Sequence, residues 1–351
     1  MDTYGLEASK KASWLSMNAK VKQTRILIHQ YGTKVPSNFT AYSQLGLSSS
    51  SSSNTYKSVL NGENTRPPDR QMSDGQQIQL LFLCAMEPGT ESTLFTSPLP
   101  NLEDDKEYHG TLPWNKLIDS TGFPQQTSNT SKEEILMSER KRCSFWGINS
   151  YEFDDSGTVI FPANGSLFQT SVNGSVGFKE ISSQFSSLNA TMCPSDPSLI
   201  AYYAQYNMWI FDANTNFQTK LTDLSEADKA SGHSAGLPSY IMQEEFNRYT
   251  GFWWCPVADS DESQYILFER VDESQVQEVK ITSHEGVSED HRFPKTGETN
   301  ATSDLKLIKL DRDTLSPTVF DLNFDLHEYF PWYEYLVRAG WTPDGKRYIN
   351  K

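Results

Sequence analysis

Short apolar segments separated by turn sequences fill the chain from about residue 77 onward, and this pattern limits the folds that it can adopt. Segments of strand length include IQLLFLCAM, TVIFPA, LIAYYAQ and YILFERV, with turn sequences such as DDSG and PSDP between them. Two turn-then-strand units, at Asp155 and Asp196, repeat after roughly 40 residues, which is the length of one β-propeller blade. The sequence therefore predicts a mainly β protein, either part of a β-propeller or a β-sandwich.

The sequence divides into three regions. Residues 1–45 are predicted to form an N-terminal helical extension, because the apolar residues from Trp14 to Ile28 lie on one helical stripe. Residues 46–76 contain the serine run Ser48–Ser53 and then a polar stretch, so they cannot bury a core and are interpreted as a disordered insertion. Residues 77–351 carry the strand pattern.

Composition excludes several classes of function. The formal net charge of −15 argues against a surface for nucleic acid or for an anionic membrane. The apolar run LLFLCAM is too short to span a bilayer, and the N-terminus lacks an apolar signal core, which predicts a cytoplasmic protein. The cysteines are far apart and the histidines form no ligand-spaced pair, so we predict reduced thiols and neither metal nor cofactor.

The segment YIMQEEFNRYTGFWWCP, residues 240–256, holds the strongest candidate for a binding site. Glu244 and Glu245 are adjacent acids between an apolar lead-in and a cluster of aromatic residues. Partly desolvated carboxylates favour a cationic partner, whereas an ordinary acidic surface is the alternative. A second acid pair, Glu133 and Glu134, lies in the first turn of a helix predicted over SKEEILMSERKR, where the helix dipole explains it.

The pentapeptide from Gly232 to Gly236, GHSAG, matches the nucleophile-elbow pattern of serine hydrolases. That elbow needs an apolar strand before the serine and a helix after it, but SEADKAS precedes this match and LPSY follows it. We therefore reject Ser234 as a nucleophile and assign no catalytic residue.

Several segments, in the same order, resemble the dipeptidyl peptidase IV family, in the branch formed by dipeptidyl peptidases 8 and 9. The strongest are SAGLPSYIMQEEFNRYTGFWWCP, FERVDES, RFPKTG and RAGWTPDGK, and weaker ones are SERKR, GINSYEF and MCPSDPS. By this resemblance, Glu244 and Glu245 are the pair that binds the free α-ammonium of a peptide. Arg142, in SERKR, matches the arginine that reaches the substrate from a mobile segment, although the residues after it differ from the family pattern.

The resemblance also implies a fold and an activity. Residues from about 77 onward would form the first part of an eight-bladed β-propeller, which family members follow with a C-terminal α/β-hydrolase domain bearing Ser, Asp and His. The complete enzymes release dipeptides from peptides with Pro or Ala in second place and need no cofactor. The partner of this chain would thus be a peptide N-terminus, and the full-length protein would form a homodimer.

The hydrolase part of that pattern is absent from residues 1–351, and two interpretations remain open. In the first, the sequence is the substrate-docking part of a longer serine exopeptidase. In the second, it is a short non-catalytic form that acts as a binding or dimerising module. An open reading frame that continues into a G-W-S-x-G-G segment would favour the first, and a stop codon after Lys351 would favour the second.

Both interpretations predict that residues 1–351 alone do not cleave peptides, because acyl transfer needs a nucleophile, a base and an oxyanion hole. The purified chain should release no chromophore from a Gly-Pro or Ala-Pro reporter. Turnover that Ser234→Ala abolishes would instead establish the GHSAG serine as a nucleophile, and turnover that survives this change would reveal an unassigned site.

Overall fold

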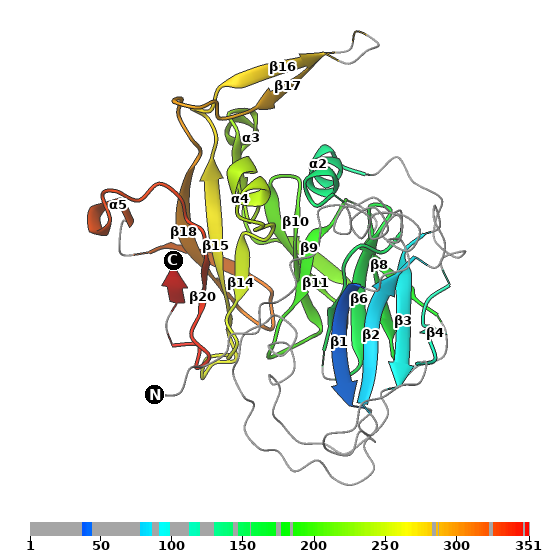
Figure 1. Cartoon of the computed structure of the whole chain (residues 1–351). Coiled ribbons are helices and arrows are strands. Elements are labelled where there is room, and N and C mark those ends of the chain that lie inside the picture. The colour runs from blue at the N-terminus through cyan, green and yellow to red at the C-terminus, as the bar shows by residue number, and fades with distance from the viewer. Residues whose placement is uncertain are drawn as a thin grey trace, which may run out of the picture. The chain divides into compact units, whose positions relative to one another are not determined.

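The computed structural model describes residues 37–43, 78–85, 91–98, 112–119, 130–142, 147–154, 156–172, 177–182, 185–282, 286, 288–322, 326–346 and 348–350 (Figure 1). The chain forms two compact units, Met1–Leu117 and Ile118–Lys351, which we describe separately. The helix predicted at residues 13–30 and the Ser-rich insertion at 46–76 lie outside the described residues. Within the predicted helical extension 1–45, the described residues form a strand, β1 (Ser37–Ser43), where Phe39 and Ala41 alternate with polar residues.

The first unit contains a four-stranded antiparallel sheet in the order β1-β2-β3-β4. The other strands are β2 (Ile78–Cys84), β3 (Thr93–Pro98) and β4 (Asn115–Lys116). The apolar run that we expected to be a core strand is β2, where Leu81, Phe82 and Leu83 are all buried. Phe82 stacks on Phe95 of β3 with ring centroids 6.0 Å apart, which closes one face of this sheet.

The second unit begins with two four-stranded antiparallel meanders. The first contains β5 (Glu152–Phe153), β6 (Thr158–Ala163), β7 (Ser166–Ser171) and β8 (Lys179–Ser182), and the second contains β9 (Leu188–Met192), β10 (Leu199–Ala204), β11 (Asn207–Asp212) and β12 (Phe217–Lys220). The turns Asn164–Gly165 and Gln205–Tyr206 have positive φ at both residues, as the type I′ turn of a two-residue hairpin requires.

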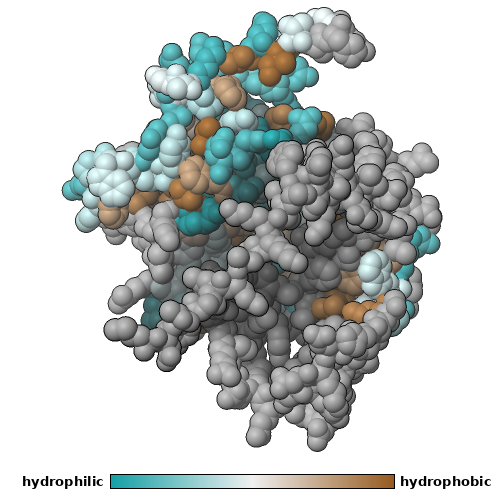
Figure 2. All heavy atoms as spheres, viewed as in Figure 1, coloured by the Kyte–Doolittle hydropathy of each residue, from teal (hydrophilic) through white to brown (hydrophobic). Residues whose placement is uncertain are grey.

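A third sheet follows and carries a separate hairpin. It contains β13 (His233–Ala235), β14 (Phe252–Trp254), β15 (Gln264–Asp272), β18 (Thr302–Leu310) and β19 (Pro317–Asp321). The hairpin of β16 (Glu278–Thr282) and β17 (Ser288–Arg292) projects away from this sheet, and its surface is mostly hydrophilic (Figures 1 and 2). The remaining elements are β20 (Ala339–Trp341), β21 (Tyr348–Asn350), α2 (Lys132–Arg140), α3 (Glu226–Ala230), α4 (Tyr240–Glu244) and α5 (Leu326–Tyr329).

Apolar side chains cover both faces of the middle sheet of this unit, which is formed by β9, β10, β11 and β12. Leu199 and Ala201 of β10 pack in a core with strands β15 and β18, whereas Ile200 and Tyr202 pack in a core with β6 and β7. A two-sheet sandwich leaves one face of each sheet outward, but successive meanders that pack face to face are the blades of a β-propeller. The prediction of a partial propeller is confirmed.

Every strand pair among the described residues is antiparallel, so these residues contain no parallel sheet of an α/β hydrolase. Within the same described ranges, no helix combines the length and the apolar character needed to cross a membrane.

The third sheet has an interrupted edge that positions α4. Strands β13 and β14 pair with successive parts of β15, so the chain between them leaves the sheet and returns to it. Gly251 donates its N–H to the Gly236 carbonyl at 3.2 Å, which closes the base of this excursion. A Cβ atom at position 251 would lie only 2.8 Å from the Gly236 carbonyl carbon, so glycine permits the close approach.

We expect Gly251→Ala to destabilise the chain by about 1–3 kcal/mol, because the obstructing atoms are backbone atoms that cannot rotate away. The urea midpoint of the purified chain measures this loss. Gly340→Ala is the matched control, since nothing lies within 4 Å of its added Cβ, and it should stay within about 0.5 kcal/mol. Equal midpoints for the two variants would contradict the close-approach argument.

Candidate amine-binding site

The paired acids lie at the end of a short helix inside this excursion. Glu244 is the last residue of α4 and Glu245 is its C-cap, whose N–H donates to the Ile241 carbonyl at 3.0 Å. Asn247 then adopts a left-handed backbone with φ of 51°, which stops the helix. Adjacent residues on a regular helix diverge by about 100°, so the position of the two acids at the end of a short helix bears on whether they can face one ligand.

The two carboxylates differ in exposure and in partners. The Glu244 side chain is 21% exposed and pairs with Arg142, whose Nη2 lies 2.5 Å from Oε1 of Glu244. Glu245 is exposed, and its carboxylate makes no hydrogen bond or ion pair with any described residue. One acid is thus anchored and the other is available to a ligand.

Arg142 comes from the end of α2, as the sequence predicted. It follows the C-cap of that helix with a left-handed φ of 54°, and its Nη1 donates to the Glu139 carbonyl at 3.1 Å. Its side chain is 74% exposed, so its pairing with Glu244 is open to competition from solvent and from ligands. The structure therefore brings Arg142 to Glu244, although the sequence separates them by about 100 residues.

Contacts at the end of α2 hold that helix against α4. The Arg140 Nη1 donates to Oε1 of Gln243 at 2.8 Å, and its guanidinium lies over the Tyr240 ring at 4.9 Å. The Tyr249 hydroxyl donates to the Arg140 carbonyl at 3.2 Å. Burial lowers the pKa of Arg140, and nearby acids oppose this change. These contacts join α2, which Arg142 follows, to α4, which ends at Glu244.

The second acid pair is more than a response to the helix dipole. Ser131 is the N-cap of α2, and its hydroxyl accepts from the Glu134 N–H at 3.1 Å. The Glu134 carboxylate, however, accepts a hydrogen bond from the Ser186 hydroxyl, and burial raises the pKa of Glu134. Glu134 therefore ties α2 to the chain before β9, a contact that the helix-dipole explanation did not include.

The segment after the acids is anchored by a buried ion pair. Arg248 is 6% exposed and Glu269 of β15 is fully buried, with Nη1–Oε2 at 2.6 Å and Nη2–Oε1 at 3.0 Å. Arg248 also donates to the carbonyls of Thr250 at 3.2 Å and Leu336 at 2.8 Å. Trp253 of strand β14 adds a contact, since the Arg248 guanidinium lies 5.8 Å from the centroid of its ring. Arg248 therefore links the turn to the sheet.

Sequence reasoning missed this pair, although one signal was present. Glu269 sits in the middle of the apolar segment YILFERV, where an acid is costly unless a cation satisfies it. The GHSAG serine, in contrast, lies within strand β13 opposite Val271, and its hydroxyl contacts the Leu237 carbonyl at 3.4 Å. It is therefore not at the strand-to-helix turn that a nucleophile elbow requires.

Comparisons with known proteins identify the family of the chain. A family model described as the dipeptidyl peptidase IV (DPP IV) N-terminal region matches residues 163–350, more than half of the sequence. This chain belongs to the dipeptidyl peptidase IV family. Glu244 and Glu245 fall inside the matched residues, whereas Arg142 precedes them.

Relatives in this family are only partly covered by the chain. Dipeptidyl peptidase 8 of Homo sapiens is 31% identical over 299 residues, which are 78% of this chain and 33% of that protein. Dipeptidyl peptidase 8 of Mus musculus is 30% identical over 299 residues, and the match again covers 78% of this chain and 33% of that protein. A crystal structure of Porphyromonas gingivalis dipeptidyl peptidase 4 matches with a TM-score of 0.49 and 16% identity, covering 77% of this chain and 34% of the other. The chain thus spans about a third of the length of the curated relatives.

A cavity lies near the end of α4 in this family member. It has a volume of about 320 Å³, and polar and aromatic side chains line it, including Lys141, Tyr151, Asn247 and Tyr249. The size is at the lower end of the range for small-ligand sites. Asn247 is two residues beyond Glu245, so the cavity adjoins the turn that carries the acids.

We expect Glu269→Leu to destabilise the chain by about 3–5 kcal/mol, because it leaves the Arg248 charge buried without its partner. The double variant Arg248→Met with Glu269→Leu removes both charges and should recover part of that loss. Urea unfolding of the three proteins measures both effects.

Glu289→Gln provides the control, since Glu289 forms an exposed pair with Lys132 at 3.5 Å and should change stability by about 0–1 kcal/mol. A Glu269→Leu protein as stable as this control would show that the buried pair does not anchor the turn.

Proposed function

We propose that this chain is the substrate-docking propeller part of a cytoplasmic dipeptidyl peptidase and that Glu244 and Glu245 bind the α-ammonium of a peptide. Membership of the dipeptidyl peptidase IV family supports the assignment. The observation that carries it is the exposed Glu245 carboxylate, which lies beside the Glu244–Arg142 pair on a turn that a buried ion pair anchors.

The two acids suit an ammonium group for chemical reasons. An ammonium has three donors, and each carboxylate can accept at least one of them as a charge-assisted hydrogen bond. Glu245 offers free acceptors, and Glu244 has a second oxygen besides the one that contacts Arg142. Because an acetylated or internal amide carries no charge, this arrangement selects for a free N-terminus and measures distance from it.

Arg142 has a different task in this proposal. Its guanidinium repels an ammonium, but it donates readily to a peptide carbonyl oxygen. Since its side chain is exposed, it can turn from Glu244 towards a carbonyl when the ammonium arrives. The cavity lined by Lys141 and Asn247 adjoins both carriers of the site, although Glu244, Glu245 and Arg142 do not line it.

The reaction would take place at residues outside this sequence. The whole enzyme would release dipeptides from peptides with Pro or Ala in second place by serine-type acyl transfer, and it would act as a homodimer. The alternative function is a non-catalytic module that uses the same acids to bind peptide N-termini or dimerises with a complete enzyme.

In an active peptidase that carries residues 1–351, we expect Glu244→Gln and Glu245→Gln each to lower kcat/KM for an H-Gly-Pro reporter by about 10–150-fold. This range corresponds to the loss of one charge-assisted hydrogen bond of about 1.5–3 kcal/mol. Arg142→Ala should have a smaller effect, because water can replace part of the hydrogen bond that the guanidinium would donate to a peptide carbonyl.

Glu298→Gln is the control, since Glu298 is exposed on the loop after β17 and should leave kcat/KM unchanged. An N-acetylated reporter should not be cleaved by any of these proteins. Normal cleavage of the free-amine reporter by both glutamine variants would show that the acids form an ordinary polar surface.

A further inference from the structure

The loop that follows the β16–β17 hairpin begins with an aromatic residue in a fixed position. The N–H of Phe293 donates to the Gln277 carbonyl at 2.9 Å, which continues the pairing of the two hairpin strands by one more residue. Pro294 comes next, and a residue that precedes proline is restricted to extended backbone. Phe293 is therefore held at the base of the hairpin.

Arg292, the residue before Phe293, fixes the base of the hairpin to the chain that leaves β15. Its Nη1 donates to the carbonyls of Glu273 and Val276, each at 3.1 Å. Its Nη2 pairs with Oε1 of Glu278 at 3.0 Å. Because the Arg292 side chain is only 20% exposed, water and salt screen these contacts less than they would at the surface. The position of Phe293 thus follows from the third sheet.

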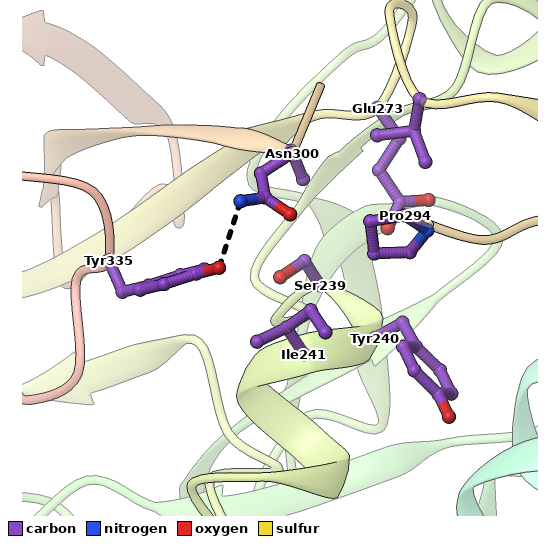
Figure 3. Close-up of a pocket in the computed structure, with 9 residues that line it drawn as sticks. Ser239, Tyr240, Ile241, Glu273, Pro294, Asn300 and Tyr335 are labelled. Atoms are coloured by element: carbon purple, nitrogen blue, oxygen red, sulfur yellow. Dashed lines mark hydrogen bonds between the residues drawn. The ribbon is translucent and has the colours of Figure 1, made fainter. Parts of the chain in front are cut away.

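Phe293 packs on the first residue of α4. Its ring centroid lies 5.1 Å from that of Tyr240, with the two ring planes tilted by 57°. Figure 3 shows that Tyr240 projects from the side of α4 on which Pro294 lies. The hydrogen bond between Asn300 and Tyr335, at 2.8 Å, lies on the other side of the helix start. Tyr240 is therefore the side chain of α4 that meets the base of the hairpin.

The same Tyr240 ring meets the last residue of α2. The guanidinium carbon of Arg140 lies 4.9 Å from the ring centroid, within the range of a cation–π contact. The Nη1 of Arg140 donates to Oε1 of Gln243 at 2.8 Å, and Gln243 directly precedes Glu244. The ring thus contacts the hairpin through Phe293 and the end of α2 through Arg140.

The hairpin also reaches the first residue of α2. The Lys132 Nζ lies 3.5 Å from Oε2 of Glu289 and 3.5 Å from the Asp290 carbonyl oxygen. Both partners of the ion pair are more than half exposed, so this contact contributes little. The aromatic contact at Tyr240 is therefore the firmer link between the hairpin and the helices of the site.

We propose that Phe293 is a positioning residue for the amine-binding site: it holds Tyr240, which aligns the end of α2, and so places Arg142 beside Glu244. This inference rests on the proposed function. It predicts that the Phe293 ring affects substrate binding without contacting the substrate, and that its effect passes through Arg142.

The test uses steady-state kinetics of an active peptidase that carries residues 1–351, with a free-amine Gly-Pro reporter. Phe293→Leu keeps an apolar side chain but removes the ring. It should raise KM about three- to tenfold with a smaller change in kcat, as the loss of one aromatic contact would. Phe320→Leu on β19 is the matched control, because Phe293 is 41% and Phe320 43% exposed, and it should leave KM unchanged.

Two variants of Tyr240 test the middle of this series of contacts. Tyr240→Leu removes the ring that contacts both Phe293 and Arg140, so it should raise KM at least as much as Phe293→Leu does. Tyr240→Phe keeps the ring and should give a KM within about twofold of the original value. A Tyr240→Phe protein as impaired as Tyr240→Leu would overturn the inference, because the ring contacts would then not be the cause.

A double-variant cycle separates positioning from a general structural role. In an Arg142→Ala background, Phe293→Leu should change KM by less than about twofold, because residues that act through one another are not additive. Additive effects of the two changes, or equal KM values for Phe293→Leu and Phe320→Leu, would overturn the inference. If Glu244→Gln is also silent, the proposed function fails; if Glu244→Gln is severe, only the role of Phe293 fails.

Discussion

The position of the candidate site depends on the buried ion pair between Arg248 and Glu269. Glu269 lies in the middle of β15, which pairs with β13, β14 and β18, so it is fixed by the most connected strand of the third sheet. Arg248 follows the acids by three residues and joins their turn to that strand. A buried ion pair of this kind is weak evidence for net stability, because desolvation offsets most of the attraction. What the pair provides here is a link, because Arg248 bonds Glu269 of the sheet as well as the carbonyls of Thr250 and Leu336.

The charges near the paired acids are balanced by arginines on different elements. Arg142 and Arg140 come from α2, and Arg338 donates to the Phe246 carbonyl at 3.0 Å from the segment before β20. A turn with two adjacent carboxylates would otherwise be destabilised by their repulsion. Arg142 is the exposed half of the pair, whereas its partner Glu244 is mostly covered. In the proposed function, an additional cation would be accepted by a movement of the Arg142 side chain.

Much of this architecture could be predicted from the sequence, because the signals are local. Strands such as β2 and β10 are continuous apolar segments, and the start of α2 is visible as Ser131 ahead of the acids of the first turn. The helix that carries Glu244 is short and ends at that residue. Arg142 was placed by its sequence motif, and the structure brings it to Glu244.

The features that escaped prediction depend on pairs far apart in the sequence. Arg248 and Glu269 meet only because β14 and β15 are antiparallel neighbours, and no local pattern states which acid a given arginine will find. The same applies to the contact between Glu134 and Ser186. The interrupted edge formed by β13 and β14 was also not foreseen, because each piece is too short to be recognised as a strand.

The most direct test of the central claim is a crystal structure of the active peptidase bound to a peptide with a free N-terminus. The account predicts that the ammonium nitrogen lies about 2.7–2.9 Å from one carboxylate oxygen of each of Glu244 and Glu245. It also predicts that Arg142 has moved from Glu244 towards a peptide carbonyl. A peptide whose ammonium lies away from both acids, with the Arg142–Glu244 pair intact, would contradict it.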